Sequence, residues 1–210
     1  MYTPQHNKAQ DKQEILEFMK AHDFAVLVTS HENKIMATHL LFLFDGDAEN
    51  LTLVSHMAKA NQQWKQFSNA GEVMVIFQGS HSYVSPFNYE KDLNVPTWNY
   101  IAVHAYGLVS VMESGDEKLK LLHRLVSHHD PEYFEKKFKT LPEDFIRNKM
   151  KGIVAFKIKV TRLEERFKLS QDKTDVEKQN IINSLSLSGG NEAAGIVSAM
   201  KNLYDNDSKK

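Results

Sequence analysis

Apolar and polar residues alternate along much of the first half of the chain in a pattern that is typical of β-strands. Between residues 24 and 112 the apolar runs are short, and turn-forming residues separate them. Strands are expected over residues 24–29, 35–44, 51–55, 72–77, 81–85 and 99–112, and a last one over residues 152–160. In the longest run Val103 and Ala105 fall on one face and His104 and Tyr106 on the other, so one face is expected to be buried. Gly107 predicts a bend or bulge in this run.

Helical periodicity is found before, between and after these strands. Helices are expected over residues 11–21, 116–129, 132–138 and 142–150, followed by a pair over residues 172–187 and 191–204 that Gly189 and Gly190 separate. A further helix is expected to begin directly after Ser55 and to end near Phe67. Many early strands with few strand–helix–strand units favour an α+β, mainly β chain: an antiparallel barrel with peripheral helices.

The length of 210 residues suits one well-packed core with a small appendage. We therefore divide the chain into a barrel domain over residues 1–168, with helices inserted at about 115–150, and a C-terminal helical extension over residues 169–210. No internal repeat interrupts this plan.

The composition narrows the function by exclusion. The formal net charge of −1 leaves no overall positive field to attract nucleic acid or an anionic membrane, so DNA binding would need a local patch or a partner. The absence of cysteine excludes disulfides, thiolate catalysis and cysteine-ligated metal centres. The polar N-terminus and the lack of any apolar run of roughly 20 residues favour a cytoplasmic protein with no membrane contact.

The stretch from Leu53 to Trp64 is the strongest candidate for a ligand site. An apolar strand leads into the helix that is expected after Ser55, and free backbone amides at a helix start attract anions. The Ser55 hydroxyl, the His56 ring and the Lys59 ammonium would lie within one turn of those amides. The alternative is an ordinary strand-to-helix junction that binds only water.

Other motifs give weaker signals. His128 and His129 end a predicted helix, where a cation complements the helix dipole. We expect this capping role and no metal site, because adjacent helical side chains point about 100° apart and their rings would not easily share an ion. Trp98 follows a proline and is a candidate core residue, dimer contact or wall for a planar ligand. No catalytic residue is predicted, since no nucleophile elbow, Walker loop or dinucleotide fingerprint is present.

The charged segment after the last strand, Arg162 to Gln171, is open to two interpretations. It is either a solvated run of charges or a segment that returns over the barrel and places Lys168, Ser170 or Gln171 near a ligand.

Six sets of short motifs, in order from residue 1 to about 200, together resemble one family. They are Met1–Pro4; Ala37–Leu40; Ser55–Asn61 with Trp64; Phe77–Gly79 with His81–Pro86; Val95–Tyr100 with Val103 and His104; and Lys168–Gln171. This pattern resembles the PaiB family of FMN-binding proteins, described as negative transcriptional regulators of protease production and sporulation. The resemblance implies a split β-barrel related to the pyridoxamine-phosphate oxidases and flavin reductases, which forms a homodimer with FMN near the subunit interface.

The resemblance also implies roles for individual residues. The flavin phosphate would be held by Ser55, His56 and Lys59, with Asn61 as a polar neighbour. The flavin ring would lie along the strand with backbone groups of Thr38, His39 and Leu40, and would be approached by Trp98 and Asn99 from either subunit.

Three functions remain open: a regulatory FMN-binding protein, a flavin-dependent oxidoreductase, or an interaction module with an altered site. The predicted helix pair over residues 172–204 has too mixed a charge pattern for a DNA-recognition helix. Any contact with DNA would therefore be direct through an unrecognised surface or indirect through a DNA-binding partner.

Overall fold

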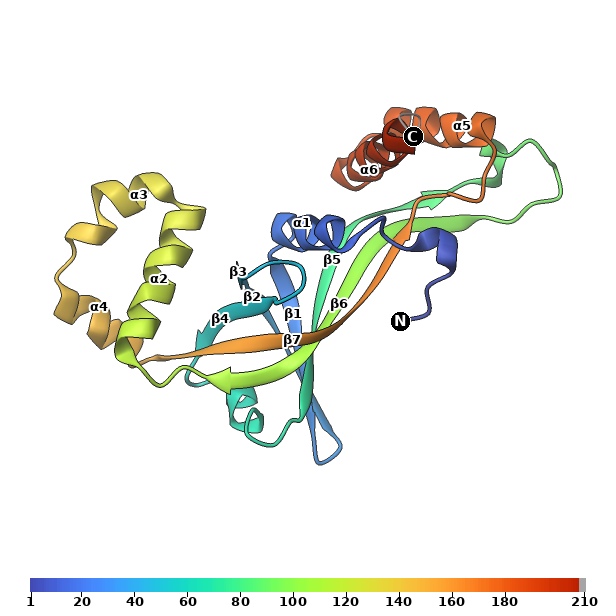
Figure 1. The fold of residues 1–210 in the computed structure, drawn as a ribbon. Helices are drawn as coiled ribbons and strands as arrows, with labels where there is room; N and C mark the ends of the chain where they lie inside the picture. The colour runs from blue at the N-terminus through green and yellow to red at the C-terminus, as the bar shows by residue number, and fades with distance from the viewer. Residues whose placement is uncertain (208–210) are drawn as a thin grey trace. The chain divides into compact units, whose positions relative to one another are not determined.

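The computed structural model describes residues 1–207, with side chains through Tyr204, and contains one antiparallel, seven-stranded sheet in the order β2-β1-β5-β6-β7-β4-β3 (Figure 1). The strands are β1 (Phe24–His31), β2 (Lys34–Leu41), β3 (Leu43–Asp45), β4 (Thr52–Ala58), β5 (Glu72–Val84), β6 (Thr97–Val111) and β7 (Ile153–Lys168). The helices are α1 (Lys12–Ala21), α2 (Gly115–His129), α3 (Pro131–Lys136), α4 (Glu143–Met150), α5 (Asp175–Ser188) and α6 (Asn191–Asp207), with short 3-10 helices η1 (Gln5–Asn7), η2 (Gln62–Gln66), η3 (Pro86–Asn88) and η4 (Phe138–Thr140). The predicted mainly β, split-barrel fold is confirmed.

The chain forms two compact units. The first contains residues Met1–Phe18, Gln78–Val103 and Glu164–Lys210, and the second contains Met19–Phe77 and His104–Leu163. The long strands β5, β6 and β7 each contribute a segment to both units. The division into a barrel over residues 1–168 and a helical extension over residues 169–210 stays a prediction.

The core of the second unit is aromatic. Phe42, Phe77 and Phe156 are completely buried. The Phe42 ring meets the edges of the other two at centroid distances of 6.0 and 6.4 Å, an arrangement that aromatic quadrupoles favour. This core lies beneath β4, the strand that carries the main candidate site.

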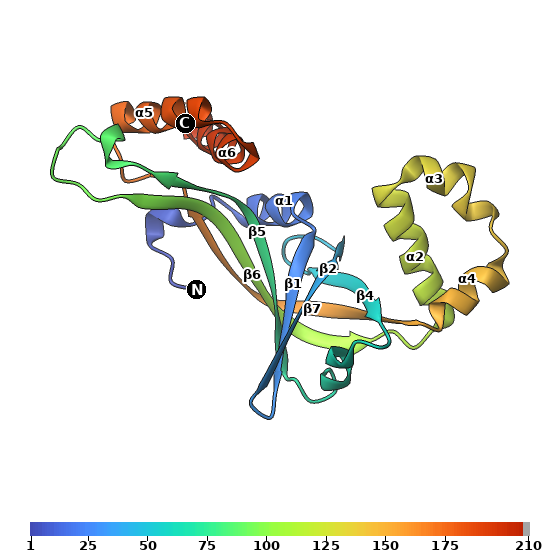
Figure 2. The ribbon, with the colours of Figure 1, turned by 180° about the vertical axis from the view of Figure 1, so that it is seen from behind.

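Helices α2, α3 and α4 form a helical excursion between β6 and β7 (Figure 2). The buried Leu121 and Leu125 of α2 pack with Val54 of β4 and Ala155 of β7. This packing fixes α2 against the strand that carries the candidate site.

In the first unit, α5 and α6 lie side by side (Figures 1 and 2). A capping box joins Thr174 and Glu177 at the start of α5, which satisfies two backbone amides that would otherwise lack partners. Gly189 and Gly190, both with positive φ, end the helix as the sequence predicts.

Three predicted boundaries are wrong. The two strands expected over residues 72–77 and 81–85 are one strand, β5, because pairing in the sheet overrides the local turn preference of Gln78-Gly-Ser80. The strand expected over residues 35–44 is divided between β2 and β3 at Phe42. The last strand continues eight residues beyond Val160, to Lys168.

The charged residue Arg162 lies within the extended part of β7 and has partners on other strands of the sheet. Arg162 lies 3.6 Å from the centroid of the Tyr106 ring and pairs with Glu72 at 3.2 Å. The charged run is therefore largely a strand and not a segment returning over the barrel.

At Gly107, where the sequence predicts a bend or bulge, the structure shows a close contact between strands. A Cβ atom at this position would lie 2.5 Å from the Lys159 carbonyl oxygen. Glycine is therefore required because β6 and β7 approach each other closely here.

Among the residues that the structure describes, no helix combines the length and apolar character needed to cross a membrane.

Candidate functional site

Ser55 lies in the middle of β4 and not at the start of a helix. Its side chain is completely buried, and its hydroxyl donates to the Leu41 carbonyl at the end of β2, at 2.5 Å. This bond links two strands that are not neighbours in the sheet order. The Ser55 hydroxyl is thus already used in holding the curled sheet together.

The helix predicted after Ser55 is absent, and so is the row of free amides. The strand continues to Ala58, the Lys59 N–H donates to the Gly152 carbonyl at 2.8 Å, and the Asn61 N–H donates to the Ala58 carbonyl at 2.9 Å. Only the five-residue helix η2 follows. The predicted cradle of backbone amides is wrong, because Gly152 accepts the Lys59 amide and Ala58 accepts the Asn61 amide. Anion binding here would therefore depend on side chains.

His56 and Lys59 supply such side chains. Successive strand residues point to opposite faces, so the His56 ring lies on the face opposite Ser55. Its Nδ1 atom is buried and has no hydrogen-bond partner among the described residues, and burial lowers the pKa of His56. Lys59 is exposed, and none of the described side chains pairs with its ammonium group. These two nitrogens remain available to a ligand.

Thr38 and Asn61 are brought together. The Asn61 Nδ2 atom donates to the Thr38 hydroxyl at 2.9 Å, and its Oδ1 atom accepts the Gln63 backbone N–H at 3.0 Å. The pair ties β2 to the turn after β4, which brings two polar stretches that are distant in the sequence side by side in space.

Gln63 is a residue that the sequence did not single out. It is completely buried, and its Nε2 atom donates to the carbonyls of Leu27 and Met36 at 3.0 and 3.1 Å. It holds η2 against the β1–β2 hairpin. Its position in a polar Gln-Gln-Trp run gave no signal of burial.

One edge of β2 has no neighbouring strand in the sheet that the described residues form. The hairpin turn consists of Glu32 and Asn33, both with positive φ, so the flanking pair His31 and Lys34 is the hydrogen-bonded one. Hydrogen-bonded and non-hydrogen-bonded pairs alternate along an antiparallel ladder. Counted from Lys34, His39 falls in a non-hydrogen-bonded pair, so its backbone N–H and C=O point to the free edge. The Leu41 carbonyl, two residues on, accepts Ser55 from that same edge.

Of the three β2 residues assigned to the flavin ring, His39 alone therefore presents its backbone at the free edge. Thr38 and Leu40 direct theirs to Leu27 and Ala25 of β1. The His39 side chain is exposed, and its ring stacks on Phe24 at a centroid distance of 6.0 Å.

Trp98 and Asn99 lie in the first unit and have contrasting environments. Asn99 is completely buried, and its Nδ2 atom donates to the Ser170 hydroxyl at 2.9 Å and contacts the Met200 sulfur at 3.8 Å. Trp98 is 46 % exposed, with its ring stacked on His81 at 5.6 Å. Asn99 and Ser170 hold β6, the end of β7 and α6 together, whereas Trp98 is accessible.

Lys168 and Gln171 also satisfy internal partners. The Lys168 ammonium donates to the Thr97 hydroxyl, and burial followed by the charge of Arg166 lowers the pKa of Lys168. The Gln171 Oε1 atom accepts the Leu169 backbone N–H at 2.8 Å. The Lys168–Gln171 motif therefore forms the chain corner that follows β7.

The candidate residues thus fall into two sets, one in each unit. In the second unit the His56 and Lys59 nitrogens and the His39 backbone remain free to bind a ligand. In the first unit most polar groups are occupied by the protein itself. Neither set pairs a nucleophile with a base, so the residues are suited to binding and orienting a molecule that carries its own chemistry.

The comparison with known families matches residues 1–162 to the family described as "Putative FMN-binding domain". A curated relative, Protease synthase and sporulation protein PAI 2 of Bacillus subtilis (strain 168), is 35% identical over 214 aligned residues, which cover 100% of this chain and 99% of the relative.

Two solved structures have the same fold at low sequence identity. An FAD and heme binding protein of Mycobacterium smegmatis has a TM-score of 0.61 and 14% identity, over 87% of this chain and 80% of that one. A putative 5-nitroimidazole antibiotic resistance protein of Bacteroides thetaiotaomicron has a TM-score of 0.55 and 16% identity, over 75% of this chain and 84% of that one. At these identities the likeness concerns the fold alone. The family match and the full-length relative together show that the chain belongs to the PaiB family of FMN-binding-domain proteins.

Proposed function

We propose that this chain binds FMN in its second unit and acts as a PaiB-like negative regulator of transcription in the cytoplasm. The observation that carries the proposal is the pair of unpartnered nitrogens at the end of β4, His56 Nδ1 and the Lys59 ammonium, in a chain of the FMN-binding family. A phosphate dianion provides the acceptor oxygens that both groups lack.

Lys59 is the proposed main phosphate ligand. Its ammonium is free to move in solvent and does not need to leave an internal ion pair before it binds an anion. His56 would supply a second nitrogen from a partly desolvated position, where a hydrogen bond is electrostatically stronger than in water. Ser55 would support the phosphate site indirectly, through the bond that joins β4 to β2.

The free edge of β2 is the proposed contact for the polar edge of the flavin ring. An unpaired strand edge offers N–H and C=O groups in a row, and His39 presents one of each. Thr38, held by Asn61, and Leu40 would border the ring through their side chains. Trp98 remains a proposed neighbour of the cofactor because it has the accessible surface that a planar ligand requires, whereas Asn99, Lys168, Ser170 and Gln171 bond within the protein and are proposed to support the fold.

Bound FMN would supply electron and hydride transfer, while the protein supplies binding and orientation. The regulatory role is supported by the PAI 2 relative, and regulation would proceed through DNA or through a DNA-binding partner.

A homodimer is part of the proposal. Phe87, Leu93 and Val95, in and after η3, are large apolar side chains that are at least 73% exposed. Such a group of apolar residues is typical of a surface covered by a partner. Sedimentation at micromolar protein concentration should give the mass of two chains, and a monomer would contradict this part of the proposal.

The experiment that tests FMN binding is a titration of flavin-free protein, followed by flavin fluorescence. One FMN per chain with an oxidised-flavin spectrum is expected. If no FMN binds at micromolar concentrations, the flavin proposal is wrong.

The regulatory proposal has a separate test in anaerobic mixing of the flavin-loaded protein with NADH or NADPH. We expect the flavin absorbance to persist. Rapid bleaching would instead establish the flavin-dependent oxidoreductase.

A further inference from the structure

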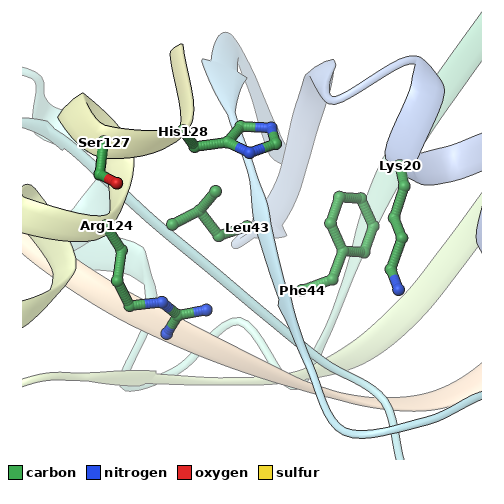
Figure 3. A pocket seen from close by; sticks show the side chains of 6 residues that line it. All are labelled: Lys20, Leu43, Phe44, Arg124, Ser127 and His128. Atoms are coloured by element: carbon green, nitrogen blue, oxygen red, sulfur yellow. The ribbon is translucent and has the colours of Figure 1, made fainter. Parts of the chain in front are cut away.

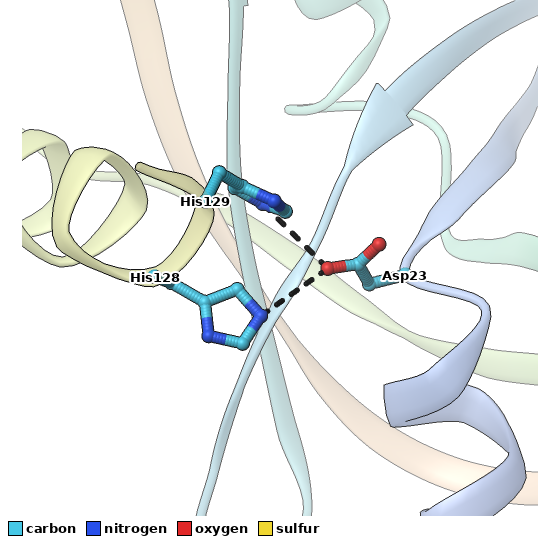
Figure 4. Close-up of side chains that lie close together, drawn as sticks. All are labelled: Asp23, His128 and His129. Atoms are coloured by element: carbon cyan, nitrogen blue, oxygen red, sulfur yellow. Dashed lines mark ion pairs between the residues drawn. The ribbon is translucent and has the colours of Figure 1, made fainter. Parts of the chain in front are cut away.

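Two histidines at the end of α2 approach one aspartate from a distant part of the chain. The Nε2 atoms of His128 and His129 lie 3.5 and 3.6 Å from the same Asp23 carboxylate oxygen (Figure 4). One potential ligand atom from each residue lies within 4.8 Å of the other two. The prediction that these rings would diverge is wrong.

The rings converge because the helix ends here. Adjacent residues leave a helix about 100° apart, but both imidazoles extend past the last turn toward the segment between α1 and β1. Their centroids are 4.8 Å apart at an interplanar angle of 80°, so the rings meet edge to face and each directs a nitrogen to Asp23.

The distances are longer than direct hydrogen bonds and are compatible with ligands around a cation. A charge-assisted N–H···O bond has a length of about 2.7 to 2.9 Å, which is well below both observed distances. Around a tetrahedral Zn²⁺, with bonds of about 2.0 to 2.1 Å, neighbouring ligand atoms are about 3.4 Å apart. The spacing between Asp23 and the two nitrogens is close to this value.

The surroundings also favour a cation. The C-terminus of a helix carries partial negative charge, and both histidines lie in the last turn of α2. Asp23 is held in place because its carbonyl accepts the Phe42 N–H at 2.9 Å. The adjacent Asp130 carboxylate already caps α3 by accepting the Tyr133 N–H, so Asp23 is the acidic ligand at this position.

Solvent reaches the cluster. The side chains of His128 and Asp23 are 57% and 20% exposed. His128 also lines an open cavity of about 510 Å³, together with Lys20 and Arg124 (Figure 3). The Arg124 guanidinium is paired with the Asp45 carboxylate, which reduces its repulsion of a metal ion.

We propose that Asp23, His128 and His129 bind a divalent zinc-type metal ion, with water in the fourth position. Two imidazole nitrogens and a carboxylate oxygen are a ligand set suited to Zn²⁺ and Co²⁺. The ion ties the end of α2 to the start of β1. This site is independent of the proposed flavin site, since it uses none of the same residues.

The test is a calorimetric titration of metal-free, full-length protein without a histidine tag, using Zn²⁺. One ion per chain is expected. His128→Gln, His129→Gln and Asp23→Asn should each weaken binding by more than about tenfold, the lower limit for loss of even an outer-sphere partner of a metal. His31→Gln is the matched control, because His31 is a half-buried surface histidine that lies outside the cluster and pairs with Glu32 at 3.7 Å. It should bind Zn²⁺ like the unmodified chain.

Two further readouts separate a metal site from a simple ion pair. Co²⁺ should give the intense visible bands of a tetrahedral ion in the unmodified chain and in His31→Gln. Zn²⁺ should raise the thermal midpoint of both, but not of the His128→Gln/His129→Gln double variant, because only a folded site binds the ion. The proposal is overturned if the unmodified chain binds Zn²⁺ no more tightly than the double variant, with folding of both verified by circular dichroism.

Discussion

The end of β4 and the Lys168–Gln171 corner both carry motifs that the PaiB resemblance assigns to the flavin, yet their polar groups are used differently. At the corner, Asn99, Ser170 and Gln171 bond to one another or to nearby backbone. At the end of β4, His56 Nδ1 and the Lys59 ammonium have no partner among the described residues. Two motifs that the resemblance assigns to the flavin therefore have different roles. The Lys168–Gln171 corner holds the fold, and the end of β4 leaves groups free for a ligand.

The largest expected effect tests the orientation of β2. In Leu40→Pro the lost N–H is the one directed to Ala25 of β1, so the hairpin loses a ladder bond and its pairing is disrupted. In His39→Pro the lost N–H lies at the free edge, where proline is tolerated. Urea denaturation should show a loss of several kcal/mol for Leu40→Pro and about 1 kcal/mol or less for His39→Pro.

The two proline variants also test ligand binding. His39→Pro should remain folded and bind FMN more weakly. If His39→Pro is as destabilised as Leu40→Pro, the assignment of the free edge is incorrect.

A smaller effect is expected at the corner. Asn99→Ala removes a buried amide and leaves the Ser170 hydroxyl without its partner, at a cost of about 1 to 3 kcal/mol in the free energy of unfolding. FMN affinity, measured on the folded fraction, should change little. A large loss of FMN affinity with unchanged stability would assign Asn99 to the ligand and remove the contrast between the two regions.

The smallest effect concerns pH. Burial lowers the pKa of His56, so the folded chain binds a proton at this ring less readily than the unfolded chain does. The resulting stability is complete above the unfolded-state pKa of about 6.5 and is lost as pH falls below it. His56→Gln should lose less stability than the unmodified chain between pH 7.5 and 5.5 when no FMN is present. Equal pH dependence in the two proteins would show that the ring is not desolvated.

The alternation of apolar residues predicted most strands because it reflects burial on one face of a sheet. It failed after Ser55, where Met57 and Ala58 favour a helix locally but pair with Val154 and Ile153 of β7. Pairing with a strand about 100 residues away is not visible in a local pattern. For the same reason the burial of Gln63 could not be predicted, because its hydrogen-bond partners come from the β1–β2 hairpin.

The candidate site was predictable only in part. The sequence indicates Lys59 and His56 as candidates because the motif places them together. The role of the His39 backbone depends on strand register, and the approach of Asp23 to His128 depends on the tertiary fold, so neither follows from spacing along the chain.

The central claim is that the Lys59 ammonium holds the flavin phosphate, and the most direct test compares FMN with riboflavin, which lacks the phosphate. In the unmodified chain FMN should bind more tightly than riboflavin, and Lys59→Ala should reduce this difference by about 1.5 to 3 kcal/mol, the range for hydrogen bonds to charged groups. Lys65→Ala, which removes another exposed lysine from η2, should leave the difference unchanged. An undiminished preference for FMN in Lys59→Ala would contradict the account.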